Sequence, residues 1–308
     1  MKSLTSKDFA GLFGTTEEEI NIFCGDLIKK YEFKYRELSL EERDALILKI
    51  IKAIYSENLK QAGENRKNDW ETGWSENLND FINSNYDLSK LAPKYFKSDV
   101  PARFGGDFYQ TISDNFVLNY YQVFKHWLFN KYLKDYKNIY EFGCGPAYHL
   151  CYLNEIFPEK NLFGFDWAES SLKIIDLLRE KKKININGSK FDFFHPDYGV
   201  DFNPNSCAFT YGALEQVGSD FNDFLDFLLE KKPDLIVNIE CINEFYNQDN
   251  LVEYLAYEYH SKRNYLNGYY NELLELEKLN RIKIITAHHH KFGNIYNDTA
   301  NYIIWKIL

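Results

Sequence analysis

The stretch from residue 137 to residue 166 constrains this chain more than any other. An apolar run ends in Glu141, a turn with two glycines follows, and a helix-compatible segment comes next. A second short apolar run, Leu162–Phe165, ends in Asp166. This order predicts a β-strand, a tight turn, a helix and a second strand with an acid at its tip. Glycines let a ligand approach the backbone, the helix N-terminus offers free N–H groups, and the acid can hold a ribose diol.

The residues of the turn separate two kinds of nucleotide ligand. A dinucleotide site has the pattern G-x-G-x-x-G, and Tyr148 stands here at the third glycine position. The turn instead reads E-x-G-x-G-x-A, with Gly143, Gly145 and Ala147 as its small residues. It resembles the first motif of the class I, Rossmann-like S-adenosylmethionine-dependent methyltransferases, which often have a third glycine in place of Ala147. An NAD-dependent oxidoreductase is disfavoured by Tyr148.

Length and charge exclude other classes. At 308 residues the chain can bury a substantial core. A net charge of -10 argues against nucleic acid as a partner, because phosphate binding needs a basic surface. No run approaches the ~18 apolar residues of a membrane span, and residues 1–16 lack a signal core, so a cytoplasmic protein is expected. The five cysteines are scattered without a C-x-x-C pair, which predicts reduced thiols and no metal.

The periodicity of the chain changes near residue 136. Before it, the patterns are helical, apart from a predicted loop at 91–106. After it, nearly continuous apolar strands alternate with helices, which is typical of a parallel sheet covered on both faces. We therefore expect an α/β protein with a helical N-terminal lid or substrate module, residues 1–135, and a cofactor-binding domain, residues 136–308. The resemblance implies a mostly parallel, seven-stranded Rossmann-like sheet whose last strand is reversed.

The resemblance also implies which residues bind S-adenosylmethionine. Besides Glu141 and the small residues of the turn, Asp166 corresponds to the ribose-binding acid and Trp167 to a ring that packs on the adenine. After a polar turn at 187–188, Asp192 and Phe193 resemble the third motif, in which an acid accepts the adenine amino group. Nearby acids leave two alternatives open for that role: Asp197 and Asp201.

The segment from residue 210 to 217 resembles the fourth motif, where L-E-H-V is common. Tyr211 is the expected cofactor contact here, and Gln216 replaces the histidine. Glu215 is a candidate base or a brace for the loop. Arg103, in the predicted loop before the first strand, is a candidate partner for the methionine carboxylate.

Two further candidates for proton removal follow the fifth strand. Glu240 ends an apolar run at the carboxyl edge of the sheet, where open α/β sheets place their ligands. His260 lies on a predicted helix beside basic residues. The run His288–His290 points alternately to two faces of a strand and cannot bring three ligands to one metal. The candidate pocket residues of the helical module are Trp70, Trp74, Tyr95, Arg103 and Tyr109.

A methyltransferase that acts on an O or N nucleophile of a small molecule is therefore expected. The segment from residue 238 to 305 is similar to putative sugar O-methyltransferases, which makes a sugar or secondary metabolite one expectation. A catalytically inactive Rossmann-like binding or scaffold protein is the alternative, because Ala147 and Gln216 depart from the family pattern. The expected partner is a small-molecule acceptor, with a homodimer left open and neither nucleic acid nor a membrane expected.

Overall fold

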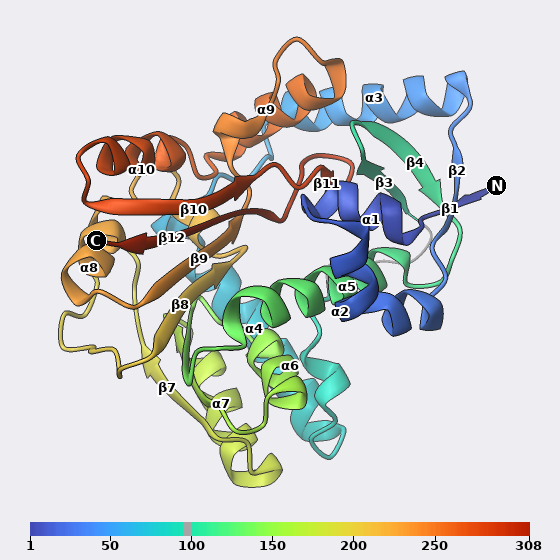
Figure 1. Cartoon of the computed structure of the whole chain (residues 1–308). Helices are drawn as coiled ribbons and strands as arrows, with labels where there is room; N and C mark the ends of the chain where they lie inside the picture. The colour runs from blue at the N-terminus through green and yellow to red at the C-terminus, as the bar shows by residue number, and fades with distance from the viewer. Residues whose placement is uncertain (95–99) are drawn as a thin grey trace.

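A seven-stranded sheet forms the centre of the computed structural model, which describes residues 1–94 and 100–308 (Figure 1). The strand order is β10-β12-β9-β8-β5-β6-β7. The strands are β5 (Asn138–Phe142), β6 (Asn161–Asp166), β7 (Ile186–Lys190), β8 (Ser206–Tyr211), β9 (Leu235–Glu240), β10 (Ile282–His288) and β12 (Asn301–Ile307). All neighbouring strands from β9 to β7 pair in parallel, whereas β12 is antiparallel to both β9 and β10. The expected mostly parallel sheet with a reversed last strand is confirmed.

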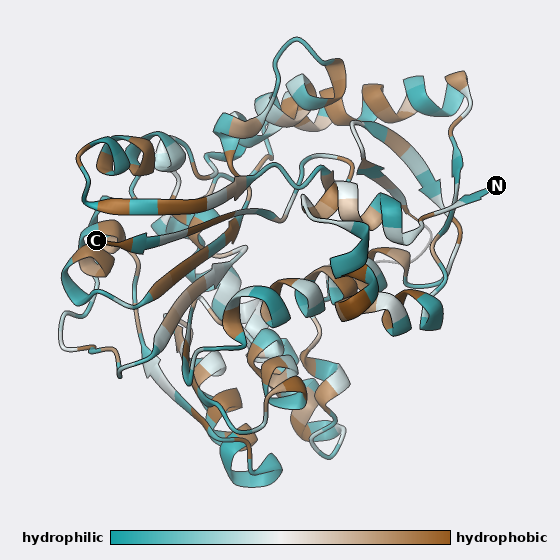
Figure 2. Cartoon of the chain, in the orientation of Figure 1, coloured by the Kyte–Doolittle hydropathy of each residue, from teal (hydrophilic) through white to brown (hydrophobic). Residues whose placement is uncertain are grey.

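Helices cover both faces of this sheet because its central strands are apolar on both sides. In β5, Ile139 belongs to one core cluster and its neighbour Tyr140 to the other. The first cluster also takes side chains from α5 (Phe116–Leu128), α6 (Tyr148–Ile156) and α7 (Glu169–Lys182). The second takes side chains from α8 (Asn222–Lys231) and α10 (Tyr269–Lys278). Figure 2 shows the central strands largely in brown, the colour of hydrophobic residues.

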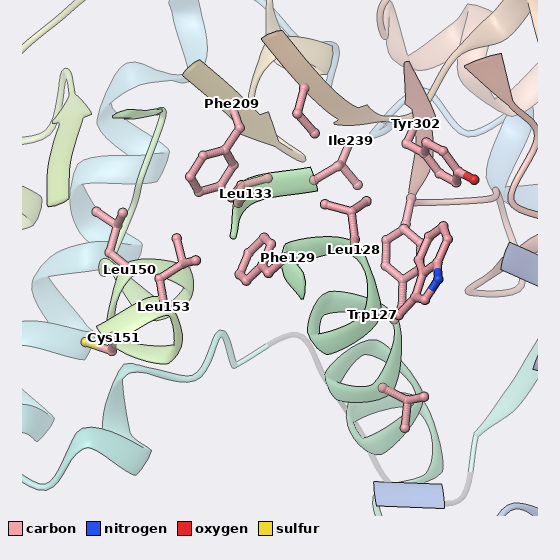
Figure 3. Close-up of a cluster of buried hydrophobic side chains, with 14 of the residues drawn as sticks. Trp127, Leu128, Phe129, Leu133, Leu150, Cys151, Leu153, Phe209, Ile239 and Tyr302 are labelled. Atoms are coloured by element: carbon pink, nitrogen blue, oxygen red, sulfur yellow. The ribbon is translucent and has the colours of Figure 1, made fainter. Parts of the chain in front are cut away.

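Helix α5 belongs to the predicted N-terminal module but packs directly on the sheet. Figure 3 shows its C-terminal end and the following turn pointing Trp127, Leu128 and Phe129 toward the strands that carry Phe209 and Tyr302. All five of these side chains are 0% or 1% exposed. One hydrophobic core therefore crosses the expected domain boundary at residues 135/136, and that boundary stays a prediction.

As expected from the sequence, the remaining helices lie in the first part of the chain, apart from one in the helical region predicted after residue 250. They are α1 (Ser6–Phe13), α2 (Glu17–Lys30), α3 (Leu40–Ile54) and α4 (Lys67–Asn83). The exception is α9 (Leu251–Arg263), which packs on α3 through Val252 and Leu255 against Leu46 and Ile50. Helix α3 alternates between the two colours in Figure 2, as an amphipathic helix does.

The N-terminal part is not wholly helical, and this corrects the sequence prediction. A second, antiparallel sheet has the order β1-β2-β4-β3-β11. Its strands are β1 (Lys2–Ser3), β2 (Lys34–Glu37), β3 (Pro101–Phe104), β4 (Asp107–Thr111) and β11 (Phe292–Gly293). The glycine pair in the predicted loop is the turn of the β3–β4 hairpin, in which Gly105 and Gly106 have φ of 59° and 88°. Strands of two to five residues are too short to show a period of two in the sequence.

Two smaller predictions for the second half also differ from the structure. The polar turn expected at 187–188 lies inside β7, where four of the five residues are exposed because β7 is the edge of the sheet. The single helical region expected after residue 250 is two helices, α9 and α10. Helix α9 ends at Arg263, and the next residue, Asn264, has a left-handed backbone. No helix within the described residues is long and apolar enough to span a bilayer. The cytoplasmic location stays a prediction.

Candidate functional site

The turn after β5 requires glycine at two positions. Gly143 has a φ of 73°, and a Cβ atom there would lie 2.3 Å from the Cβ of Ala213. Gly145 has a φ of 51°, and a Cβ atom there would lie 2.9 Å from the ring of Trp74. Ala147, at the third small position, also has a positive φ, of 57°, and is fully buried at the N-terminus of α6. The turn is therefore shaped to leave backbone, not side chains, at its surface.

Asp166 at the tip of β6 is held by the same turn. Its Oδ2 accepts a hydrogen bond from the N–H of Gly145 at 2.7 Å, and its Oδ1 accepts one from Ala168 at 2.8 Å. The side chain is 5% exposed, and burial raises its pKa to about 6 although the two backbone bonds favour the charged form. The acid that the sequence places after the second strand thus lies directly against the glycine turn.

A first cavity of about 80 Å³ lies over this turn. The cofactor residues expected from the sequence that line it are Gly143, Gly145, Asp166, Trp167, Phe193 and Tyr211. Two expected pocket residues of the N-terminal module, Trp70 and Trp74 on α4, also line it, with their rings 5.5 Å apart and nearly parallel. Tyr95 lies outside the described residues.

A second, larger cavity of about 610 Å³ adjoins the first. The walls common to both include Trp70, Tyr148, His149 and Tyr211. Helix α5 and the segment 294–299 close its other sides. Of the expected site residues, Glu215 lines this cavity but not the first. The structure therefore places a large chamber beside the glycine turn.

The side wall between the cavities contains a pair that the sequence did not identify. His149 on α6 lies with its Nδ1 atom 2.7 Å from Oε1 of Glu141 at the end of β5. Glu141 is 1% exposed, and its Oε2 atom has no hydrogen-bond partner. Burial raises the pKa of Glu141 well above its ordinary value and lowers that of His149 well below 6.5. Glu141, expected as a cofactor contact, lines neither cavity, whereas its partner His149 lines both.

Three expected site residues are engaged elsewhere. Arg103 forms an ion pair with Asp298, Nε to Oδ1 at 2.9 Å, and both side chains are 2% exposed. This corrects its expected pairing with a cofactor carboxylate. Tyr109 packs against Phe104, with ring centroids 4.3 Å apart, and lines neither cavity. Asp192 pairs with Lys67 and also lies outside the lining of the first cavity, although its neighbour Phe193 contributes to that lining.

The three expected bases differ in their access to the chamber. His260 is 0% exposed, lies between the rings of Tyr246 and Tyr265, and lines neither cavity. Burial lowers its pKa to about 3. Glu240 is also 0% exposed and accepts the backbone N–H groups of Ala213 and Glu215. His260 and Glu240 are therefore not placed to take a proton from a bound molecule.

Glu215 lines the second cavity and also braces the loop that carries it. Its Oε2 accepts the N–H of Cys241 at 3.2 Å and its Oε1 accepts the side-chain amide of Gln216 at 3.1 Å. The three histidines at the end of β10 and just after it have separate partners, as their alternation suggested. His288 contacts the carbonyl of Leu12, His289 contacts Asp298, and His290 contacts Tyr120.

Comparison with known proteins adds distant likenesses. No protein-family model matches the chain, and no curated protein matches its sequence. Among solved structures, an O-methyltransferase family 2 protein from Planctomyces limnophilus, in complex with apigenin, is 11% identical with a TM-score of 0.41; the match covers 57% of this chain and 52% of that one. N,N-8-amino-8-demethyl-D-riboflavin dimethyltransferase from Streptomyces davawensis is 11% identical over 99% of this chain and 90% of that one, with a TM-score of 0.41.

A third structure, the plantazolicin methyltransferase BpumL in complex with a monoazolic desmethylPZN analog and SAH, is 13% identical over 79% of this chain and 98% of that one, with a TM-score of 0.43. The fold itself is visible in the sheet, whose strands are parallel except where β12 is reversed. By this topology, residues 138–307 form a Rossmann-like α/β fold.

Proposed function

We propose that this protein is an S-adenosylmethionine-dependent methyltransferase acting on an O or N nucleophile of a small molecule. The observation that carries the proposal is the position of the glycine turn and Asp166 in one cavity that shares its wall with a larger chamber. A cofactor in the first cavity and an acceptor in the second would meet at that wall. The rings of Tyr148 and Tyr211 belong to it.

The residues of the first cavity fit this cofactor. Side chains at Gly143 and Gly145 would collide with their neighbours, so bare backbone is available to the amino-acid part of the ligand. Each oxygen of Asp166 accepts one backbone N–H and keeps a further lone pair for a ribose hydroxyl. Trp167 and Phe193 offer flat faces for the adenine. When bound, S-adenosylmethionine supplies a methyl group that its sulfonium charge already activates.

Within this proposal, His149 removes the proton of the acceptor. Its Nδ1 is taken by Glu141, so the opposite ring nitrogen, Nε2, is the one left to accept a proton from a hydroxyl or ammonium group. The carboxylate of Glu141 then stabilises the imidazolium. Glu215 stays a second candidate because it lines the same chamber.

Calorimetry with S-adenosylhomocysteine tests the cofactor assignment. We expect wild-type protein to bind it and to show no binding of NADH. Asp166→Ala removes acceptors of buried hydrogen bonds, so affinity should fall by roughly 10-fold or more. Unchanged affinity in Asp166→Ala would contradict the assignment. Methyl transfer from labelled S-adenosylmethionine to a screened set of small molecules then separates an enzyme from an inactive binding protein, which would bind the cofactor without turnover.

A further inference from the structure

Lys125 on α5 is a buried cation in the wall of the second cavity. It is 3% exposed. Within the described residues its ammonium group has neither an ion-pair partner nor a hydrogen-bond acceptor; the rings of Tyr148 and Tyr152 lie 4.1 Å and 4.5 Å from Nζ. Ring faces attract a cation but do not accept its three N–H bonds in full.

Other buried cations of this chain have strong acceptors. Lys160, which is 4% exposed, donates to the backbone carbonyls of Lys134 and Tyr136. Arg103 has the carboxylate of Asp298. Burying an ammonium group without such a partner costs folding free energy, so buried charges in proteins are usually paired or hydrogen-bonded. Lys125 therefore has no anionic partner among the described residues. A molecule bound in the cavity can supply one.

The charges around the cavity favour the same sign of ligand. Lys49 is a second lysine in the lining. The carboxylate of Glu215 already accepts bonds from Cys241 and Gln216. Burial lowers the pKa of Lys125 to about 7, whereas the nearby acidic groups Glu141, Cys151 and Glu155 raise it. A bound anion would hold the ammonium in its charged form.

Aromatic rings form much of the remaining wall. The tyrosines that line the cavity are Tyr121, Tyr148, Tyr211, Tyr265 and Tyr296. Such walls suit a flat, ring-shaped molecule.

We propose that the second cavity takes an acceptor in which a carboxylate is attached to an aromatic ring, and that Lys125 binds this carboxylate. The inference rests on the proposed function, because it names the acceptor class of the same site. Lys125 is the buried cation at this chamber, whereas Arg103 is already paired with Asp298.

Two probes of matched shape test the proposal: 4-hydroxybenzoate and 4-hydroxybenzamide. Their affinities are measured by calorimetry at pH 6.5, with and without S-adenosylhomocysteine. We expect wild-type protein to bind the acid at least about tenfold more tightly than the amide, since a charge-assisted bond is stronger than a neutral one. Lys125→Met should abolish this preference, and Lys125→Arg should keep most of it. Lys131→Met is the control, because Lys131 pairs with Glu19 and does not line the cavity.

Equal affinity of wild-type protein for the two probes, or no detectable binding of the acid, would overturn the proposal without any variant. An acid preference that survives in Lys125→Met, together with weakened S-adenosylhomocysteine binding, would assign the lysine to the carboxylate of the cofactor and would overturn it as well. Failure of wild-type protein to bind S-adenosylhomocysteine would count against the proposed function alone, because the acid and amide are also compared in its absence.

Discussion

The Nδ1 atom of His149 lies 2.7 Å from Oε1 of Glu141, and His149 belongs to the wall shared by the two cavities. Glu141 is the penultimate residue of β5, and His149 is the second residue of α6. The glycine turn between them folds the chain back so that a strand end and a helix start meet. A buried carboxylate that orients an imidazole is a common arrangement for general-base chemistry.

Replacing His149 should remove most of the turnover. We expect His149→Ala to lower kcat by about 10²- to 10⁴-fold with little change in S-adenosylhomocysteine affinity. Because burial lowers the pKa of His149 below 6.5, the wild-type imidazole stays neutral at pH 7, and the rate should not fall between pH 8 and pH 7 through its protonation. Initial rates of methyl transfer to an acceptor found by screening provide the measurement.

The control for this experiment is His195→Ala, since the side chain of His195 is 77% exposed and lies outside both cavities. Near-normal turnover in His149→Ala would show that His149 is not the base and that Glu215 or another group removes the proton. Glu141→Gln should show a smaller loss in kcat, because the imidazole remains but loses the negative charge that supports its protonated form.

Glu240 should make the fold less stable as the pH rises. Burial, reinforced by the nearby Glu215, raises the pKa of Glu240 from 4.5 to about 8. The folded state therefore binds this proton more tightly than the unfolded state, so its contribution to stability is full below pH 4.5 and is lost as the pH rises through 8. One pKa unit corresponds to about 1.4 kcal/mol. The loss should be on the order of a few kcal/mol.

Urea unfolding between pH 5 and pH 9 measures this effect. In Glu240→Gln the free energy of unfolding should depend less on pH over this range, whatever its absolute value. Glu57→Gln, at an exposed position, serves as the control and should keep the wild-type slope. A slope in Glu240→Gln as steep as that of the wild type would show that this carboxyl does not titrate as described.

A side chain at Gly143 should damage the site more than one at another left-handed glycine. Gly143→Ala places a Cβ 2.3 Å from that of Ala213, in addition to the cost of a positive φ, about 1–2 kcal/mol. At Gly105 the φ is 59° and the new Cβ atom would have open space around it, so Gly105→Ala has only the cost of the positive φ. We expect Gly143→Ala to lose cofactor affinity and Gly105→Ala to keep it, as measured by calorimetry. Equal affinities in the two variants would show that the turn does not contact the cofactor.

The core beneath α5 should hold the N-terminal part and the sheet together as one folding unit. Phe129→Ala empties a fully buried site and should cost about 3–5 kcal/mol of unfolding free energy. Leu48→Ala, at a position that is 52% exposed on α3, should change stability by about 0.5 kcal/mol or less. Denaturant unfolding provides both values.

A shortened chain that begins at residue 136 extends this test. It leaves one face of the sheet without α5, and we expect it to be insoluble or only partly folded. A soluble form with wild-type cofactor affinity would instead support an independent domain with the boundary expected from the sequence.

The local features of the site could be predicted from the sequence because neighbouring residues specify them. The apolar run before Glu141, the glycines of the turn and the acid at residue 166 lie within one strand-turn-helix-strand unit, whose geometry follows from backbone sterics and hydrogen bonding. The same reasoning gives the parallel sheet, since β9 reads as a nearly apolar run and the strands alternate with helices. Trp167, Phe193 and Tyr211 were expected from the resemblance to the family's motifs, and all three line the first cavity.

Contacts between distant segments were decided only by tertiary packing. Arg103 and Asp298 are 195 positions apart, and no local pattern indicates that they pair. His260 looked accessible beside two basic residues, but its helix turns the imidazole into a fully buried position between Tyr246 and Tyr265. Lys125 was not singled out in the sequence, and its place in the wall of the chamber follows from the packing of α5 on the sheet. Sequence periodicity specifies which face of an element is apolar, whereas the partner of a polar side chain depends on which elements share a layer and in what register, and these are properties of the assembled core.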